Sequence, residues 1–217
     1  VNAAKISADG KTGGGKVLIG GDWQGSGELL QATYVNIDNA TIISANATAS
    51  GGGGKIVLWS DIKNTNSITT VNGSLFAKGI DGEGGKIETS GSVINTDRII
   101  VNASSKLSRG GLWLIDPYDY TIDSTAVSNI TSALNSGTSV TVATSADNSN
   151  YGSGGSSSGN GDITITSNLQ TTAGSSSSAT LTLTAARHIT LNSGVSITDI
   201  NSHSLSVAMN AGGDITL

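Results

Sequence analysis

The sequence predicts an all-β fold: a right-handed parallel β-helix with one short external α-helix. The first observation behind this is a recurring phrase in which glycines precede a run of alternating apolar residues. It occurs at 13–19, 53–58, 84–89, 110–115, 161–165 and 212–217. Each copy reads as a turn followed by a strand whose every second side chain faces a core. Recurrence at roughly 20–50 residues is typical of a solenoid.

The second observation is the composition. The chain has 217 residues, with 30 Gly but only one Phe, one Met and one Pro. So few bulky residues cannot fill the core of an ordinary globular domain. Disorder is disfavoured because the net charge is only −5 and because Val, Ile and Leu alternate with Thr, Ser and Asn. Small aliphatic residues suit a narrow β-helix core, and we expect eight to ten coils spaced about 4.7–4.9 Å apart.

An internal repeat supports this prediction within residues 1–115. Four similar tripeptides end in alanine and are followed by a glycine doublet, at 6–8, 43–45, 75–77 and 101–103. Because the tripeptides are unequally spaced, we expect the turns between them to differ in length. Alternation within the strands then predicts that Leu18, Val57, Glu88 and Trp113 form one outer stripe, with Trp59 also pointing outward. Such an apolar stripe requires a cover.

One segment has the signature of a helix, at 124–136. Asp123 or Ser124 can cap its start, Val127, Ile130 and Leu134 follow a helical spacing, and Gly137 stands where a helix ends. We expect this helix to lie outside the solenoid and to cover the apolar stripe. The predicted organisation is one continuous solenoid with four parts: coils at 1–123, the helix and a return strand at 124–144, a flexible Ser/Gly loop at 145–161, and further coils at 162–217.

Composition also excludes several functional classes. The chain has no Cys, so no disulfide framework is expected. No apolar run of about 18 residues and no signal-peptide pattern occurs. The 11 Lys and Arg residues are scattered, which gives no electrostatic footprint for nucleic acid.

Residues 110–122 (Gly-Gly-Leu-Trp-Leu-Ile-Asp-Pro-Tyr-Asp-Tyr-Thr-Ile), the segment 130–142 and the later Gly-Asp-Ile-Thr-Ile resemble the filamentous-haemagglutinin-like exoproteins. These are large adhesins exported by two-partner secretion. The resemblance implies a right-handed parallel β-helix, a partner transporter in the outer membrane, a secreted or cell-surface location, and adhesion to host cells, matrix or exopolysaccharide. The family's secretion domain carries Asn-Pro-Asn motifs, which this chain lacks. It therefore resembles an internal stretch of a longer fibre.

Parallel β-helices also include polysaccharide-degrading enzymes, which need clustered acids. The best candidates are Asp116, Asp119 and Asp123, but they flank a strand end, a proline turn and a helix start, where Asp is expected as a cap. His188 and His203 lack the partner spacing of a zinc site. No Gly-x-Ser-x-Gly nucleophile elbow occurs. We therefore expect no catalytic residue, no metal and no cofactor.

For binding, aromatic residues near turns are the most informative, since aromatic faces stack on sugars and anchor interfaces. Trp23 and Trp59, with the neighbouring Asp61, are the candidates. Asn-x-Ser/Thr sequons offer candidate glycosylation sites at Asn39, Asn46, Asn72, Asn102 and Asn129.

The sequence thus favours a rigid segment of a surface adhesin that contacts host or matrix glycans or proteins. Two alternatives stay open: a structural subunit of an extracellular filament or biofilm matrix that stacks end to end, and a polysaccharide-degrading enzyme.

Overall fold

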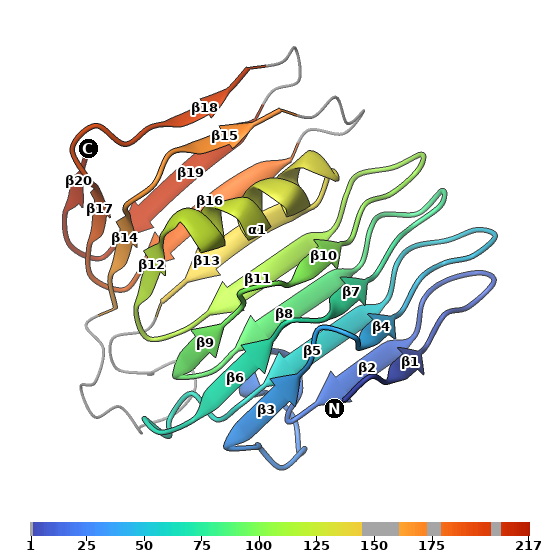
Figure 1. Cartoon of the computed structure of the whole chain (residues 1–217). Helices are drawn as coiled ribbons and strands as arrows, with labels where there is room; N and C mark the ends of the chain where they lie inside the picture. Colours follow the sequence, from blue (N-terminus) through green and yellow to red (C-terminus); the bar gives the residue numbers. More distant parts are fainter. Residues whose placement is uncertain (1, 145–160, 173–178, 201–204) are drawn as a thin grey trace.

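The computed structural model describes residues 2–144, 161–172, 179–200 and 205–217. It shows a parallel β-solenoid with one helix, in which successive coils stack from the N-terminus to the C-terminus (Figure 1). Every strand pair is parallel. Each coil contributes an element to each of three walls, and side chains from all three meet in a single long core.

The long wall is a seven-stranded sheet. Its strands are β2 (Lys16–Ile19), β5 (Lys55–Trp59), β8 (Lys86–Ser90), β11 (Leu112–Asp116), β13 (Ser139–Ala143), β16 (Thr180–Ala185) and β19 (Ser206–Ala211). One strand per coil makes seven coils in the described residues, so the expectation of eight to ten is too high. The shortfall arises because the early turns carry insertions: Lys16, Lys55 and Lys86 are paired neighbours although 39 and 31 residues separate them.

The first wall contains a four-stranded and a two-stranded sheet. Its strands are β1 (Lys5–Ser7), β4 (Ile42–Ser44), β7 (Ser74–Phe76) and β10 (Ile100–Asn102), then β15 (Leu169–Thr171) and β18 (Ile197–Asp199). The third wall is also divided. It contains β3 (Tyr34–Ile37), β6 (Ile68–Val71) and β9 (Val93–Asn95), then β12 (Tyr120–Ile122), β14 (Ile163–Ile165), β17 (Ile189–Leu191) and β20 (Ile215–Thr216).

The repeated tripeptides lie above one another as expected. Ile6 pairs with Ile43, Ile43 with Leu75, and Leu75 with Val101. The glycine after each tripeptide is required by a close approach between coils. A Cβ on Gly53 would lie 2.0 Å from the Ala77 carbonyl oxygen, and a Cβ on Gly84 would lie 1.7 Å from that of Ala103. The corner therefore has no room for a side chain.

Trp113 reverses one prediction. It is buried in the central core, paired with Ile87 on one side and Val140 on the other, so its predicted outward direction is wrong. Leu114 instead continues the outer stripe above Glu88. Apolar residues occupy both faces of the Leu112–Ile115 stretch, so alternation alone could not choose between them. The indole N–H also has a hydrogen-bond acceptor in the core, because Trp113 Nε1 donates to Thr89 Oγ1 at 3.1 Å.

The helix α1 (Ser124–Asn135) begins and ends as predicted. The Asp123 carboxylate accepts hydrogen bonds from the backbone N–H groups of Thr125 and Ala126, and Gly137 has a φ of +89°. Its predicted role as a cover is wrong. The helix lies in the first wall between β10 and β15, as Figure 1 shows, and takes the place of a strand.

This replacement is sterically natural. A helix is about 10 Å wide, and removing one strand from a stack leaves roughly twice the spacing of 4.7–4.9 Å. The face of α1 that points inward is buried in the common core through Ala126, Ile130, Ala133 and Leu134. The coil therefore closes around a helix without losing its hydrophobic interior.

The predicted Ser/Gly loop at 145–161, apart from Gly161, and the predicted residue His203 lie outside the described residues. No helix in the described ranges is long and apolar enough to span a membrane.

Candidate functional site

The outer face of the long wall carries an insertion that sequence reasoning did not assign. Residues 20–32 leave β2, form a short 3-10 turn at η1 (Trp23–Gly25) and lie over β5. Trp59 is completely buried beneath them, so its predicted exposure as a binding residue is wrong. Gly21 and Gly25 lie against the indole ring, and Trp59 Nε1 donates to Gln31 Oε1 at 3.0 Å. Trp59 therefore anchors the insertion.

Glu88 is the second anchor of this insertion. The Gln24 backbone N–H lies 3.0 Å from each of its two carboxylate oxygens, and Ser90 Oγ donates to Oε1 at 2.8 Å. The side chain is fully buried. Burial raises the pKa of Glu88 to about 8, and the negative charge of Asp116 adds to this, while the two donors and Lys55 act in the opposite direction. The sequence signal that could have found this anchor is an acidic residue, Glu88, at a position where the paired residues of the neighbouring strands, Val57 and Leu114, are apolar.

Trp23 is partly exposed, but two lysines occupy the neighbourhood of its ring. The Nζ atoms of Lys55 and Lys86 lie 5.8 and 5.6 Å from the ring centroid, within the range of cation–π attraction. Lys55 also lies 3.7 Å from an Asp22 carboxylate oxygen. These contacts stabilise the insertion and place two cations beside the partly exposed ring of Trp23.

A hollow lies in the third wall, where its two sheets meet without pairing. Within the described residues β9 pairs only with β6, and β12 only with β14. The chain bends at Tyr118 and Asp119, just after Pro117, and β12 then pairs with β14 of the following coil. We call the resulting gap between β9 and β12 the seam.

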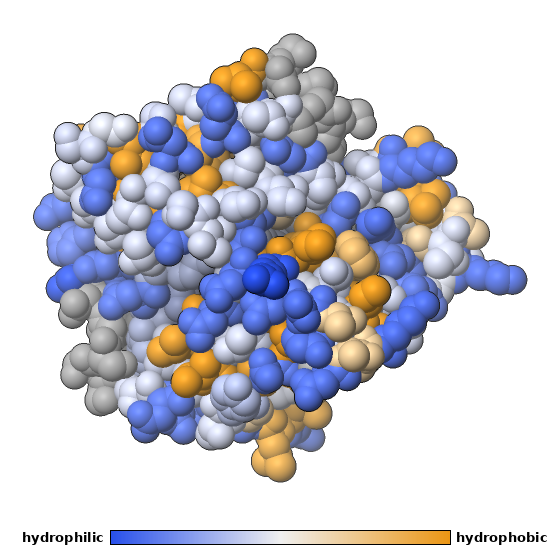
Figure 2. Space-filling view, in the orientation of Figure 1, coloured by the Kyte–Doolittle hydropathy of each residue, from blue (hydrophilic) through white to orange (hydrophobic). Residues whose placement is uncertain are grey.

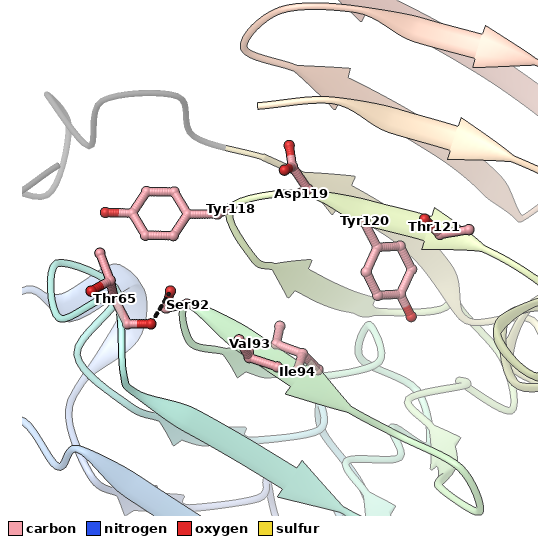
Figure 3. A pocket seen from close by; sticks show the side chains of 8 residues that line it. All are labelled: Thr65, Ser92, Val93, Ile94, Tyr118, Asp119, Tyr120 and Thr121. Carbon is pink, nitrogen blue, oxygen red and sulfur yellow. Dashed lines mark hydrogen bonds between the residues drawn. The ribbon is translucent and has the colours of Figure 1, made fainter. Parts of the chain in front are cut away.

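The seam contains a groove of about 400 Å³, shown in Figure 3. It is lined by Thr65, Ser92, Val93, Ile94, Tyr118, Asp119, Tyr120 and Thr121. In this view the Tyr118 ring lies above Thr65 and Ser92, and the Tyr120 ring extends from β12 toward β9. A smaller hollow of about 160 Å³ continues past Tyr120 and Thr121 toward Asp97 and the start of α1.

Hydrogen bonds between neighbouring segments lie near both ends of the groove. At one end the Tyr118 N–H donates to the Ser92 carbonyl at 3.5 Å. Toward the other end, Asn129 Nδ2 on α1 donates to the Thr96 carbonyl just after β9. The groove is therefore a bounded hollow and not a channel that runs through the wall.

The two tyrosines differ in their bonding. Tyr118 is only 3 % exposed, and its hydroxyl has no hydrogen-bond partner. Burial raises the pKa of Tyr118, and the nearby negative charge of Asp61 adds to the effect, so the predicted residue Asp61 lies near the same hollow. Burial and the nearby negative charge of Asp123 raise the pKa of Tyr120 to about 12, although a hydrogen bond with the Thr96 side chain acts in the opposite direction.

The three acids considered for catalysis do not converge on one reacting point. Asp116 is fully buried at the end of β11. Asp119 accepts a hydrogen bond from the Asp162 backbone at 2.8 Å, and Asp123 caps α1. Among the described residues no group of three or more His, Cys, Asp or Glu side chains could hold a metal ion. His188 Nδ1 accepts a hydrogen bond from the Asp214 N–H.

The sequon asparagines have different surroundings. Asn39 is exposed in a turn. The Oδ1 atoms of Asn46, Asn72 and Asn102 accept backbone hydrogen bonds. Asn129 uses its Nδ2, the atom that a glycan would modify, in the bond to Thr96. Asn39 is the most accessible of the five.

No protein-family model matches the sequence, and no curated protein matches it with significant similarity.

Proposed function

We propose that this chain is a rigid segment of a secreted or cell-surface bacterial adhesin that attaches to glycans of host cells, matrix or exopolysaccharide. The observation that carries the proposal is the seam, a bounded hollow lined by tyrosines and hydroxyl groups on an otherwise regular solenoid. Such a lining suits sugars, which present both apolar C–H faces and hydroxyl groups. The resemblance of residues 110–122 to exported adhesins supports the same function, with a two-partner transporter as the export partner.

The scaffold is suited to display. A solenoid in which each coil contacts its neighbours keeps a binding surface at a fixed orientation along its axis. Figure 2 shows apolar groups lying among polar ones on one face of the molecule. Weak contacts at several such points become effective when one stiff segment presents them together.

The test is a binding screen of the purified protein against immobilised matrix proteins, host-cell glycans and bacterial polysaccharides, accompanied by sizing over a range of concentrations. Saturable binding by a monomeric protein supports the adhesin. Concentration-dependent polymerisation without surface binding supports a filament subunit instead. Release of reducing sugar that disappears in Asp119→Ala supports an enzyme.

A further inference from the structure

The shape of the seam restricts what it can hold. Its two flanking strands are unpaired edges, which in an open sheet would accept an added peptide strand. Here the Tyr118–Ser92 bond links the residues just before the two strands at one end, and the Tyr120 ring extends across the gap toward β9. An added strand therefore cannot lie flat along both edges. The occupant must be compact, and 400 Å³ lies near the lower end of the range for small-molecule sites, about 300–1,000 Å³.

The Tyr118 hydroxyl supplies the second observation. Buried polar groups nearly always have a partner, so a buried hydroxyl without one requires an explanation. Tyr118 lines the groove and is almost completely buried, yet this hydroxyl makes no hydrogen bond. In Figure 3 this hydroxyl lies at the Thr65 end of the groove and points away from Tyr120, so a ligand hydroxyl would have to reach that end to bond it.

Charge narrows the ligand class. Asp119 lines the groove, Asp97 and Asp123 line the smaller hollow beside it, and no Lys or Arg lines either of the two. An anionic ligand such as a uronate, sulfate or phosphate would be repelled. The side chains of Val93 and Ile94 offer an apolar wall, with Val93 45 % exposed, while Ser92 and Thr121 offer hydroxyl groups.

We propose that the seam binds one terminal or branch sugar of a neutral polysaccharide. A sugar hydroxyl at the Thr65 end bonds the Tyr118 hydroxyl, other sugar hydroxyls bond neighbouring polar groups, and the apolar face of the sugar packs on Val93. This inference rests on the proposed adhesive function and adds the site, the neutral charge and the recognition of a chain end in place of a chain interior.

The experiment titrates the whole ¹⁵N-labelled protein with methyl glycosides of neutral hexoses and of N-acetylglucosamine at millimolar concentrations, and with methyl glucuronide as the anionic comparison. Saturable shifts of seam residues with a neutral glycoside and none with the glucuronide support the proposal. Two results overturn it: no shift at the seam with any neutral glycoside, or tighter binding of the glucuronide.

Three variants sharpen the test. Tyr118→Phe removes a hydroxyl that makes no bond within the protein, so stability should be unchanged while sugar affinity falls about tenfold. Val93→Trp, at an exposed strand position, fills the groove and should abolish binding. Tyr34→Phe is the matched control, because Tyr34 is 61 % exposed on β3 of the same wall and away from the groove. Sugar affinity unchanged in both seam variants overturns the site.

The two proposals can fail separately. If the protein binds surfaces in the screen but Tyr118→Phe and Val93→Trp bind equally well, adhesion stands and the seam site is wrong. If the glycosides bind at the seam but no polysaccharide or cell surface is bound, the site stands and the adhesive function is wrong.

Discussion

The Gln24 backbone N–H donates to both carboxylate oxygens of Glu88, at 3.0 Å each, across two coils of the solenoid. Gln24 has a φ of +52°, a left-handed conformation uncommon for a residue other than glycine. The bond therefore holds the insertion at 20–32 in a backbone conformation that the sequence alone would not favour. The insertion also covers the Glu88 carboxylate, which is completely buried.

This burial makes stability depend on pH in a definite direction. The pKa of Glu88 is raised from its ordinary value of 4.5 to about 8. The folded state therefore binds the proton more tightly than the unfolded state. The contribution of this group is least unfavourable below pH 4.5 and becomes more unfavourable as the pH rises toward 8. We expect Glu88→Gln to be more stable than the wild type at pH 8, by on the order of 4 kcal/mol, and equal to it near pH 4.

Urea unfolding of both proteins from pH 4 to pH 9 measures this difference. Asp9→Asn is the control, because hydrogen bonds outweigh desolvation and lower the pKa of Asp9, so its difference has the opposite sign. A Glu88→Gln protein whose advantage does not grow with pH would show that Glu88 is ionised in the folded state.

Trp59 should matter for stability. It is completely buried under the insertion and bonded to Gln31. We expect Trp59→Ala to lower the free energy of unfolding by about 3–5 kcal/mol, as is typical of a large aromatic removed from a core. Gln31→Ala, which removes this hydrogen bond and the one that Gln31 Nε2 donates to the Gly25 carbonyl oxygen, should cost about 1–2 kcal/mol. Equal costs for the two variants in urea unfolding would contradict this account.

The glycine corners can be tested by a pair of substitutions. Gly53→Ala places a Cβ 2.0 Å from the Ala77 carbonyl oxygen, so adjacent coils must separate. We expect a loss above about 3 kcal/mol, or failure to fold. Gly194→Ala is the control: its φ is +79°, but nothing lies within 4 Å of the added carbon. It should cost only the backbone strain of about 1–2 kcal/mol. Thermal unfolding of the two variants decides the matter.

The cap of α1 gives a smaller expected effect. Asp123→Ala leaves the N–H groups of Thr125 and Ala126 without their acceptor and should cost about 0.5–2 kcal/mol. Asp123→Asn keeps an acceptor oxygen and should retain most of the stability. Asp97→Ala, at an exposed position nearby, should have little effect. If the alanine and asparagine variants lose the same stability, the cap is not what holds the helix start.

The sequence predicted the stacking well because it depends on local rules. Glycine corners and the alternation of Ile43 and Leu75 specify both the strands and their register. The direction of the Trp113 side chain could not be predicted because its strand is apolar on both faces. The burial of Trp59 could not be predicted because the segment that covers it, residues 20–32, has no periodic pattern of hydrophobic residues. The seam could not be found at all, since it arises from a bend after Pro117 combined with the failure of two distant strands to pair.

The placement of α1 has a mechanical consequence. The ladder of the first wall is interrupted at the helix, and that of the third wall is interrupted at the seam one coil earlier, so only the long wall runs unbroken through this region. Tension along the axis is shared by three ladders in the N-terminal coils. Only two ladders carry it at the seam, where β7–β10 and β8–β11 remain paired, and only two carry it at the helix, where the long wall and β12–β14 remain paired. Under axial load the solenoid would therefore bend or rupture first at the level of residues 93–135, with the long wall as the one ladder that continues through both interruptions.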